Sequence, residues 1–149
     1  MRTFTTTHTV YKFDELSDEA KQKALENLAY TNVDFDWWDS VYYDAEQIGL
    51  ELQGFDTYRR EIDGRLTQDL PDVCKAIMAE HGDSTETYQL AVKWQHKHGE
   101  DNEEAFLKEL LQEYLSILTK EYDYLTSEEA IVETIEANEY EFYKDGRLA

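Results

Sequence analysis

The fold is decided by residues 103–125, which have the sequence EEAFLKELLQEYLSILTKEYDYL. Apolar side chains recur there at spacings of three and four residues, the periodicity of an amphipathic α-helix. Asn102 is expected to open this helix, which is the longest that the sequence predicts. Its wide apolar stripe comprises Phe106, Leu107, Leu110, Leu111, Tyr114, Leu115 and Leu118.

Two helices are predicted before residue 50. Ser17 is the expected N-cap of the first, which carries its apolar face on Ala20, Ala24, Leu25 and Leu28. Residues 32–34 are expected to end that helix and to cap a second, from Phe35 to Ile48, in which Asp34 and Asp36 lie at the start. Gly49 suits the left-handed position that follows a helix end.

Three more helices complete the expected set of six. Asp69 and Pro71 start one that ends near residues 81–82, and Ser84 is the expected cap of another that ends at Gly99. The last begins with a capping box of Thr126 and Glu129. It carries Ile131, Val132 and Ile135 on its apolar face.

Strands are predicted at both ends of the chain and in a central hairpin. Residues 3–13 alternate threonine with aromatic and β-branched side chains, and residues 140–142 alternate before a turn at 144–146. Residues 50–52 and 58–66 form the expected hairpin, with Gly54 and the pair Asp63-Gly64 as turn residues. The prediction is one α+β domain over 1–149, a small, mostly antiparallel sheet of three or four strands covered by about six helices.

The charge of the chain excludes several classes of function. Its 34 acidic and 14 basic residues give a net charge of -20, which repels nucleic acid phosphates and anionic membranes. The single cysteine, Cys74, excludes an internal disulfide, and no apolar run is long enough for a signal peptide or membrane span. We therefore expect a cytoplasmic protein that binds neither nucleic acid directly nor membranes.

No catalytic, cofactor or metal motif stands out. The residues His96-Lys97-His98 are the closest histidine pair, but positions two apart on a helix point in different directions, and His8 and His81 stand alone. The carboxylates of Asp34, Asp36, Asp39 and Asp44 suit a hard cation, yet a helix start accounts for the first two and the calcium-loop pattern is absent. The expectation is a protein that is not an enzyme and holds no cofactor or metal.

The acidic surface is the sharpest feature, because residues 100–149 hold 15 acidic against 4 basic residues. Glutamates one helical turn apart can place charge in rows, as a nucleic acid backbone does with its phosphates. The alternative is an acidic face that only solubilises the protein. Trp37 and Trp38 are adjacent on a predicted helix, so one of them is a candidate anchor at an interface. The alternative, which is favoured, is a partly buried aromatic side chain that packs along the rim of the core. The predicted partner-binding residues are Glu109, Glu113, Glu129, Glu133, Glu136, Trp37 and Trp38.

Several segments resemble a group of small acidic proteins of phages and prophages, some of which are labelled antitoxins. The segments are residues 11–16, 20–27, 36–39 with 48–50, 54–56, and 139–142 with 145–146. The resemblance implies an anti-defence protein, of the anti-CRISPR or anti-restriction class, that occupies a basic surface of a host defence nuclease or CRISPR effector. Three readings stay open: this inhibitor, an antitoxin that sequesters a toxin, and an enzyme that uses clustered carboxylates. The basic residues within 51–99 also leave self-association as a homodimer open.

Overall fold

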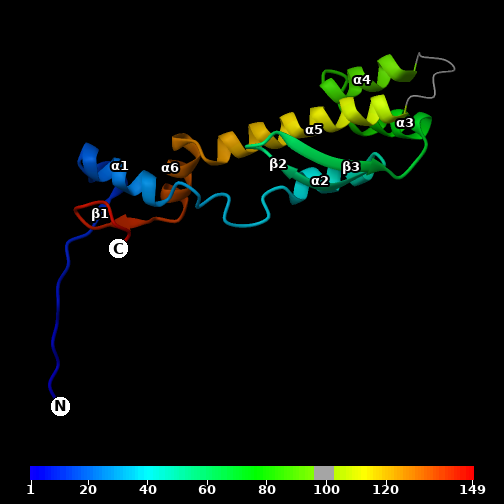
Figure 1. Ribbon diagram of the computed structural model, residues 1–149. Coiled ribbons are helices and arrows are strands. Elements are labelled where there is room, and N and C mark those ends of the chain that lie inside the picture. The colour runs from blue at the N-terminus through cyan, green and yellow to red at the C-terminus, as the bar shows by residue number, and fades with distance from the viewer. Residues whose placement is uncertain (96–102) are drawn as a thin grey trace. The chain divides into compact units, whose positions relative to one another are not determined.

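The computed structural model describes residues 1–95 and 103–149 (Figure 1). His96-Lys97-His98, Gly99 and Asn102 lie outside the described residues. The chain divides into two compact units, one formed by Met1–Phe35 and Asp123–Ala149 and the other by Asp36–Tyr122. The single domain over 1–149 stays a prediction.

The first unit combines two helices with a very short antiparallel sheet. It contains β1 (Tyr11–Lys12), a 3-10 turn η1 (Phe13–Glu15), α1 (Asp18–Asn27), α6 (Glu128–Ala137) and β4 (Glu141–Phe142). Tyr11 pairs with Phe142 and Lys12 with Glu141. Ser17 caps α1 as predicted, because its hydroxyl accepts the amide proton of Ala20. The core of this unit is formed by Leu16, Ala20, Ala24, Ile131, Ile135 and Phe142.

The second unit packs helices around a β-hairpin. It contains α2 (Asp39–Gln47), β2 (Leu50–Asp56), β3 (Glu61–Leu66), α3 (Leu70–Glu80), α4 (Glu86–Gln95) and most of α5 (Glu103–Leu125). Strands β2 and β3 pair in antiparallel register from Leu50 opposite Leu66 to Asp56 opposite Glu61. Gly49 follows α2 with a φ of 84°, as predicted for the residue after a helix end. The fully buried core side chains include Ile48, Leu50, Val73, Ile77, Phe106, Leu110 and Tyr114.

The predicted fold class is confirmed. The described residues form an α+β structure with six α-helices, and its elements follow the predicted order. The expected stripe of α5 is buried at every position except Leu107, which is half-buried. The strands form two antiparallel sheets of two strands each, whereas the sequence predicted one sheet that included both chain ends. None of the helices within 1–95 and 103–149 is both long enough and apolar enough to cross a membrane.

Two predicted elements are shorter than expected. The first strand covers only Tyr11–Lys12, and residues 1–10 are exposed without regular structure, although their sequence favours a strand. The second helix starts at Asp39 with Trp38 as its N-cap, so Asp34 and Asp36 precede the helix and do not stabilise its first turn.

The hairpin turn and two caps also differ from the prediction. Gly54 and Gly64 lie within the paired strands, and the turn is formed by residues 57–60. The Asp56 carboxylate fixes that turn by accepting the amide protons of Tyr58 and Arg59. At α4 the cap is Thr85 in place of Ser84, because the Thr85 hydroxyl accepts the amide proton of Tyr88. At α6 it is Ser127 in place of Thr126, because the Ser127 hydroxyl accepts the amide proton of Ala130.

Candidate functional site

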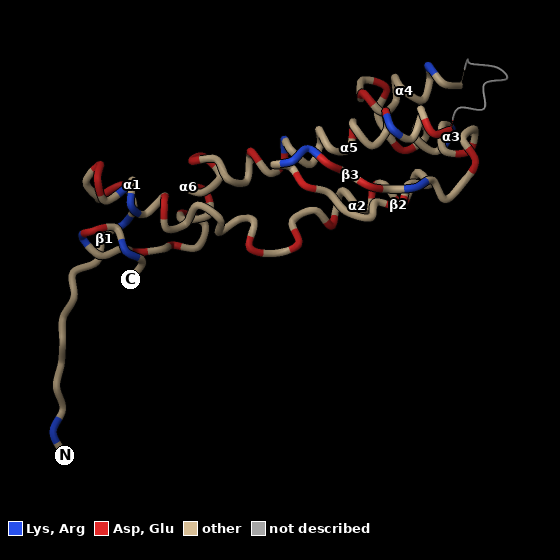
Figure 2. The backbone as a smooth tube through the Cα atoms, in the orientation of Figure 1, with Lys and Arg blue, Asp and Glu red and all other residues tan. Residues whose placement is uncertain are grey.

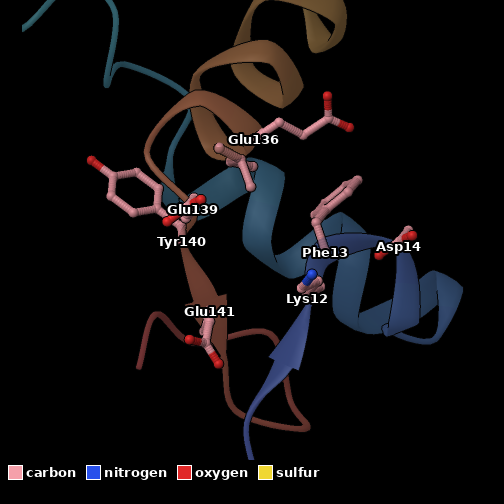
Figure 3. Close-up of a pocket in the computed structure, with 8 residues that line it drawn as sticks. Lys12, Phe13, Asp14, Glu136, Glu139, Tyr140 and Glu141 are labelled. Atoms are coloured by element: carbon pink, nitrogen blue, oxygen red, sulfur yellow. The ribbon is translucent and has the colours of Figure 1, made fainter.

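The first unit contains an acidic hollow of about 480 Å³. Figure 3 shows side chains from β1, η1, the end of α6 and β4 around it. Four of its lining residues carry carboxylates and one carries an ammonium group. Its apolar lining comes from Phe13, Tyr140 and Ile135. The residues that form this acidic hollow are Lys12, Phe13, Asp14, Ile135, Glu136, Glu139, Tyr140 and Glu141.

The end of α6 positions four residues of the acidic hollow. The Glu139 amide donates to the Glu136 carbonyl at 3.1 Å, and the Tyr140 amide donates to the Ile135 carbonyl at 3.1 Å. These two bonds form a Schellman motif, in which the residue after the C-cap takes a left-handed conformation. That residue is Glu139, with a φ of 54°. Glycine adopts this conformation without steric cost and a glutamate does not, so Glu139 holds its carboxylate here against its local backbone preference.

The other wall of the hollow comes from the end of β1 and from η1. The Lys12 amide donates to the Glu15 carboxylate at 2.8 Å, which holds η1 in place. Phe13 packs edge-to-face against the buried Phe142, with ring centroids 6.2 Å apart. This contact fixes the position of the Phe13 ring. The ammonium group of Lys21 lies 5.9 Å from the Phe13 centroid. A cation of the chain itself is thus already drawn to this ring.

The chemistry of the acidic hollow suits a long cationic side chain. Lysine and arginine place an apolar stem against rings and aliphatic groups while the charged head meets carboxylates. Arginine fits particularly well, because its planar fork of donors pairs with carboxylate oxygens and stacks on aromatic rings. The lining residues of the hollow include no serine, threonine, cysteine or histidine.

The predicted glutamates fall into two groups in different units. Glu129, Glu133 and Glu136 project from α6 in the first unit, and Glu136 lines the acidic hollow. Glu133 accepts a hydrogen bond from the Tyr124 hydroxyl at 3.0 Å, and Glu129 is exposed. Glu109 and Glu113 belong to the second unit, where both line an open hollow that α4 and α5 share.

Glu109 has a partner within the chain. Its carboxylate accepts from the Trp94 indole N–H at 2.8 Å and lies 3.4 Å from the Lys93 ammonium. Trp94 is buried against Phe106, so the Glu109 carboxylate satisfies a core indole. The Glu109 carboxylate therefore has a structural role within the chain, which the sequence did not indicate.

Trp37 and Trp38 are both half-buried in an aromatic cluster of the second unit. Their ring centroids are 5.7 Å apart, and Phe55 lies edge-on to both. The ring centroids of Tyr122 and Trp37 are 5.7 Å apart, and those of Tyr42 and Phe55 are 6.2 Å apart. The five rings line a shallow hollow of about 430 Å³. Packing at the rim of the core, the alternative to an interface anchor, describes their observed position.

A polar network in the second unit was missed by the sequence analysis. The Asp44 carboxylate accepts from the Tyr114 hydroxyl at 2.7 Å and lies 3.0 Å from His81 Nε2. The other ring nitrogen of His81 is hydrogen-bonded to the buried Thr87 hydroxyl. His81 therefore does not stand alone. The hydrogen bond from His81, with that from Tyr114, lowers the pKa of Asp44, while burial raises the pKa of Tyr114.

This network ties together elements that are distant in sequence. Asp44 belongs to α2, Tyr114 to α5, His81 ends α3, and Thr87 lies in α4. Both Tyr114 and Thr87 are closed to solvent, so a substrate could not reach them. We assign the network to stability. The tyrosine in an otherwise apolar stripe was the one signal in the sequence that a polar partner had to exist.

The four carboxylates that were weighed as a cation site, and for which no metal was predicted, lie in different surroundings. Asp34 and Asp36 are exposed before α2, Asp39 is in its first turn, and Asp44 joins the polar network. Within 1–95 and 103–149, no three His, Cys, Asp or Glu side chains are arranged to hold a metal ion. The histidine pair at 96 and 98 lies outside the described residues.

Sequence reasoning found one carboxylate of the acidic hollow, Glu136, and missed the rest. Lys12, Phe13 and Asp14 are far from α6 in sequence, and only the pairing of β1 with β4 brings them near it. The chain matches no protein-family model, and neither a curated protein nor a solved structure matches it.

Proposed function

We propose that this protein is a non-catalytic inhibitor that binds a basic surface of another protein and receives an arginine or lysine side chain of that partner in the acidic hollow. The observation that carries this proposal is Glu139. Glu139 has a left-handed backbone conformation, and its carboxylate lines the same hollow as three further carboxylates and two aromatic rings. Backbone strain of this kind concentrates at functional sites.

Electrostatics supports a cationic partner. The hollow is lined by four carboxylates and one ammonium group, and the whole chain carries a charge of -20. Such a field speeds the approach of a positive surface and repels phosphates. The exposed Glu129 of α6 adds to it. Proteins that bind nucleic acid contact its phosphates with lysine and arginine side chains, and an acidic surface of this kind could cover those side chains.

The resemblance to phage proteins favours a defence nuclease or CRISPR effector as the partner class. An inhibitor of this class would compete with nucleic acid for the same arginine and lysine side chains. Its inhibition should therefore weaken as ionic strength rises.

The decisive experiment measures DNA cleavage by candidate defence nucleases in the presence of the protein. The wild type is compared with E136Q/E139Q, which removes two carboxylates of the hollow, and with E46Q/E80Q, which removes two exposed carboxylates from α2 and α3. Both variants change the net charge equally. We expect E46Q/E80Q to inhibit as the wild type does and E136Q/E139Q to lose inhibition.

Equal inhibition by the two variants would reject the hollow as the binding site. If no nuclease is inhibited and the protein neutralises a toxin from the same genomic neighbourhood, the antitoxin hypothesis replaces the hypothesis of a nuclease inhibitor.

A further inference from the structure

Residues 2–10 form an arm whose sequence and structure disagree. Figure 1 shows them as an extended trace that leads into β1, and all are exposed. Within the described part of the chain, no hydrogen bond involves residues 2–9. Yet six of these nine residues are β-branched, and such residues favour strands. Among the residues that the structure describes, this strand-forming segment has no strand partner.

The arm alternates strictly between two kinds of side chain. Its odd positions are all threonine, at Thr3, Thr5, Thr7 and Thr9. Its even positions are Arg2, Phe4, Thr6, His8 and Val10. In an extended strand successive side chains point to opposite faces, so one face is a threonine row and the other carries the ring and aliphatic groups.

The arm also lacks the acidic residues of the rest of the chain. No aspartate or glutamate occurs before Asp14, whereas the whole chain contains 34. Figure 2 shows no acidic position between the N-terminus and β1. Two copies that each carry a charge of -20 repel one another, but their arms can approach without bringing carboxylates together.

We propose that the arms of two copies pair as antiparallel strands about a two-fold axis at Thr6, so that the chain forms a homodimer. In this register Thr5 faces Thr7 of the second copy, and Phe4 faces His8 of the second copy. Threonine then meets threonine at every odd position, and cross-strand threonine pairs and ring pairs stabilise antiparallel strands. Arg2 faces an uncharged valine, so no like charges oppose one another. The second copy satisfies the backbone groups of alternate residues of the arm, those on the edge that faces it.

Because residues 2–10 lead directly into β1, pairing of the arms would lengthen β1 toward the N-terminus in each copy. Isolated two-stranded ribbons are weak, so this dimer should be in equilibrium with monomer. Residues 1–10 belong to neither buried core, although the His8 ring lies edge-on to the Tyr143 ring with centroids 6.1 Å apart. Thr5 and Thr7 are exposed, so substitutions at these two positions are expected to leave the folded units intact.

Paired charge variants of the full chain test the proposal by sedimentation velocity over a wide range of concentrations. T5D/T7D and T5K/T7K each place like charges opposite one another across the two-fold axis. Each should weaken dimerisation about tenfold or more relative to the wild type. A mixture of the two should form heterodimers, because aspartate then faces lysine at both positions. Native mass spectrometry distinguishes heterodimers from homodimers by mass.

Each alternative result overturns the proposal. A wild type that stays monomeric at every concentration excludes arm pairing. A T5D/T7D chain that dimerises as the wild type does shows that another surface joins the copies. Monomers in the mixture, with a dimeric wild type, would reject the register centred on Thr6.

Discussion

Asp44 is the residue on which the polar network of the second unit depends. It accepts hydrogen bonds from two groups, and one of them, the Tyr114 hydroxyl, belongs to a side chain with no exposed surface. Buried hydroxyl groups are costly when they lose their partner. A single carboxylate thus satisfies a donor on α5 and orients the histidine that ends α3.

Removing the carboxylate should destabilise the protein through that hydroxyl. We expect Asp44→Ala to cost about 1–3 kcal/mol in unfolding free energy, because the Tyr114 hydroxyl is left unpaired. In a Tyr114→Phe background the same change should cost less, since no hydroxyl remains to satisfy. Urea unfolding of the four proteins measures the coupling. Equal costs in both backgrounds would show that the bond adds nothing to stability.

The same carboxylate should make stability depend on pH. Its pKa in the folded protein is lowered, chiefly by the hydrogen bond from His81, so folding favours its ionised form. This contribution is complete above the pKa of the unfolded chain, near ~3.9, and is lost as pH falls through the lower folded value. The stability difference between wild type and Asp44→Asn should therefore shrink below about pH 4. A difference that stays constant in acid would contradict the assignment.

At the scale of elements, two glycines in one hairpin have different roles. A side chain at Gly64 would lie 2.8 Å from the Glu51 carbonyl oxygen and 2.9 Å from a methyl group of Leu111. Nothing lies within 4 Å of the equivalent position at Gly54. The sequence analysis assigned both to turns, because a glycine required by close packing looks the same in sequence as one required by a turn.

Alanine substitution should separate the two roles. Gly64→Ala is expected to destabilise the protein by about 1–3 kcal/mol, because β3 or α5 must shift to admit the methyl group. Gly54→Ala is the matched control and should change stability by less than about 0.5 kcal/mol. Chemical denaturation compares the two, and similar losses would mean that strand conformation, not packing, needs glycine.

The end of α6 offers a prediction in which stability and binding move in opposite directions. Glu139→Gly should raise the unfolding free energy by about 1 kcal/mol, because glycine adopts the left-handed conformation without strain. The same change removes a carboxylate from the acidic hollow and should weaken binding of a basic partner. Thermal unfolding and the nuclease inhibition assay give the two readouts. A less stable Glu139→Gly protein would show that the glutamate is not strained.

Most elements could be predicted from the sequence because their signals are local. The stripe of α5, the Ser17 cap and Gly49 each depend on neighbours a few residues away. The failures were of two kinds. Adjacent serine and threonine residues, such as Ser127 and Thr126, compete for one cap position, and only the helix start decides between them. The acidic hollow depends on pairing across more than a hundred residues, between β1 and β4, which no local pattern reports.

At the scale of the whole molecule, charge should act on folding and binding with opposite signs. A net charge of -20 repels itself in the compact state, and salt screens this repulsion. Raising ionic strength from 0.01 M to 0.15 M shortens the Debye length from about 30 Å to about 8 Å. The melting temperature should therefore rise over this range while affinity for a basic partner falls. A melting temperature that drops with salt would indicate that ion pairs, not repulsion, dominate the surface.

The second unit also holds all three tryptophans and the single cysteine of the chain. Trp37, Trp38, Trp94 and the buried Cys74 all belong to Asp36–Tyr122. Indole fluorescence and thiol labelling therefore report only on the second unit and not on the unit that carries the acidic hollow. Circular dichroism detects the helices of both units. If dichroism and fluorescence report the same melting curve, the two units unfold as one cooperative body, and the chain is a single domain in the thermodynamic sense.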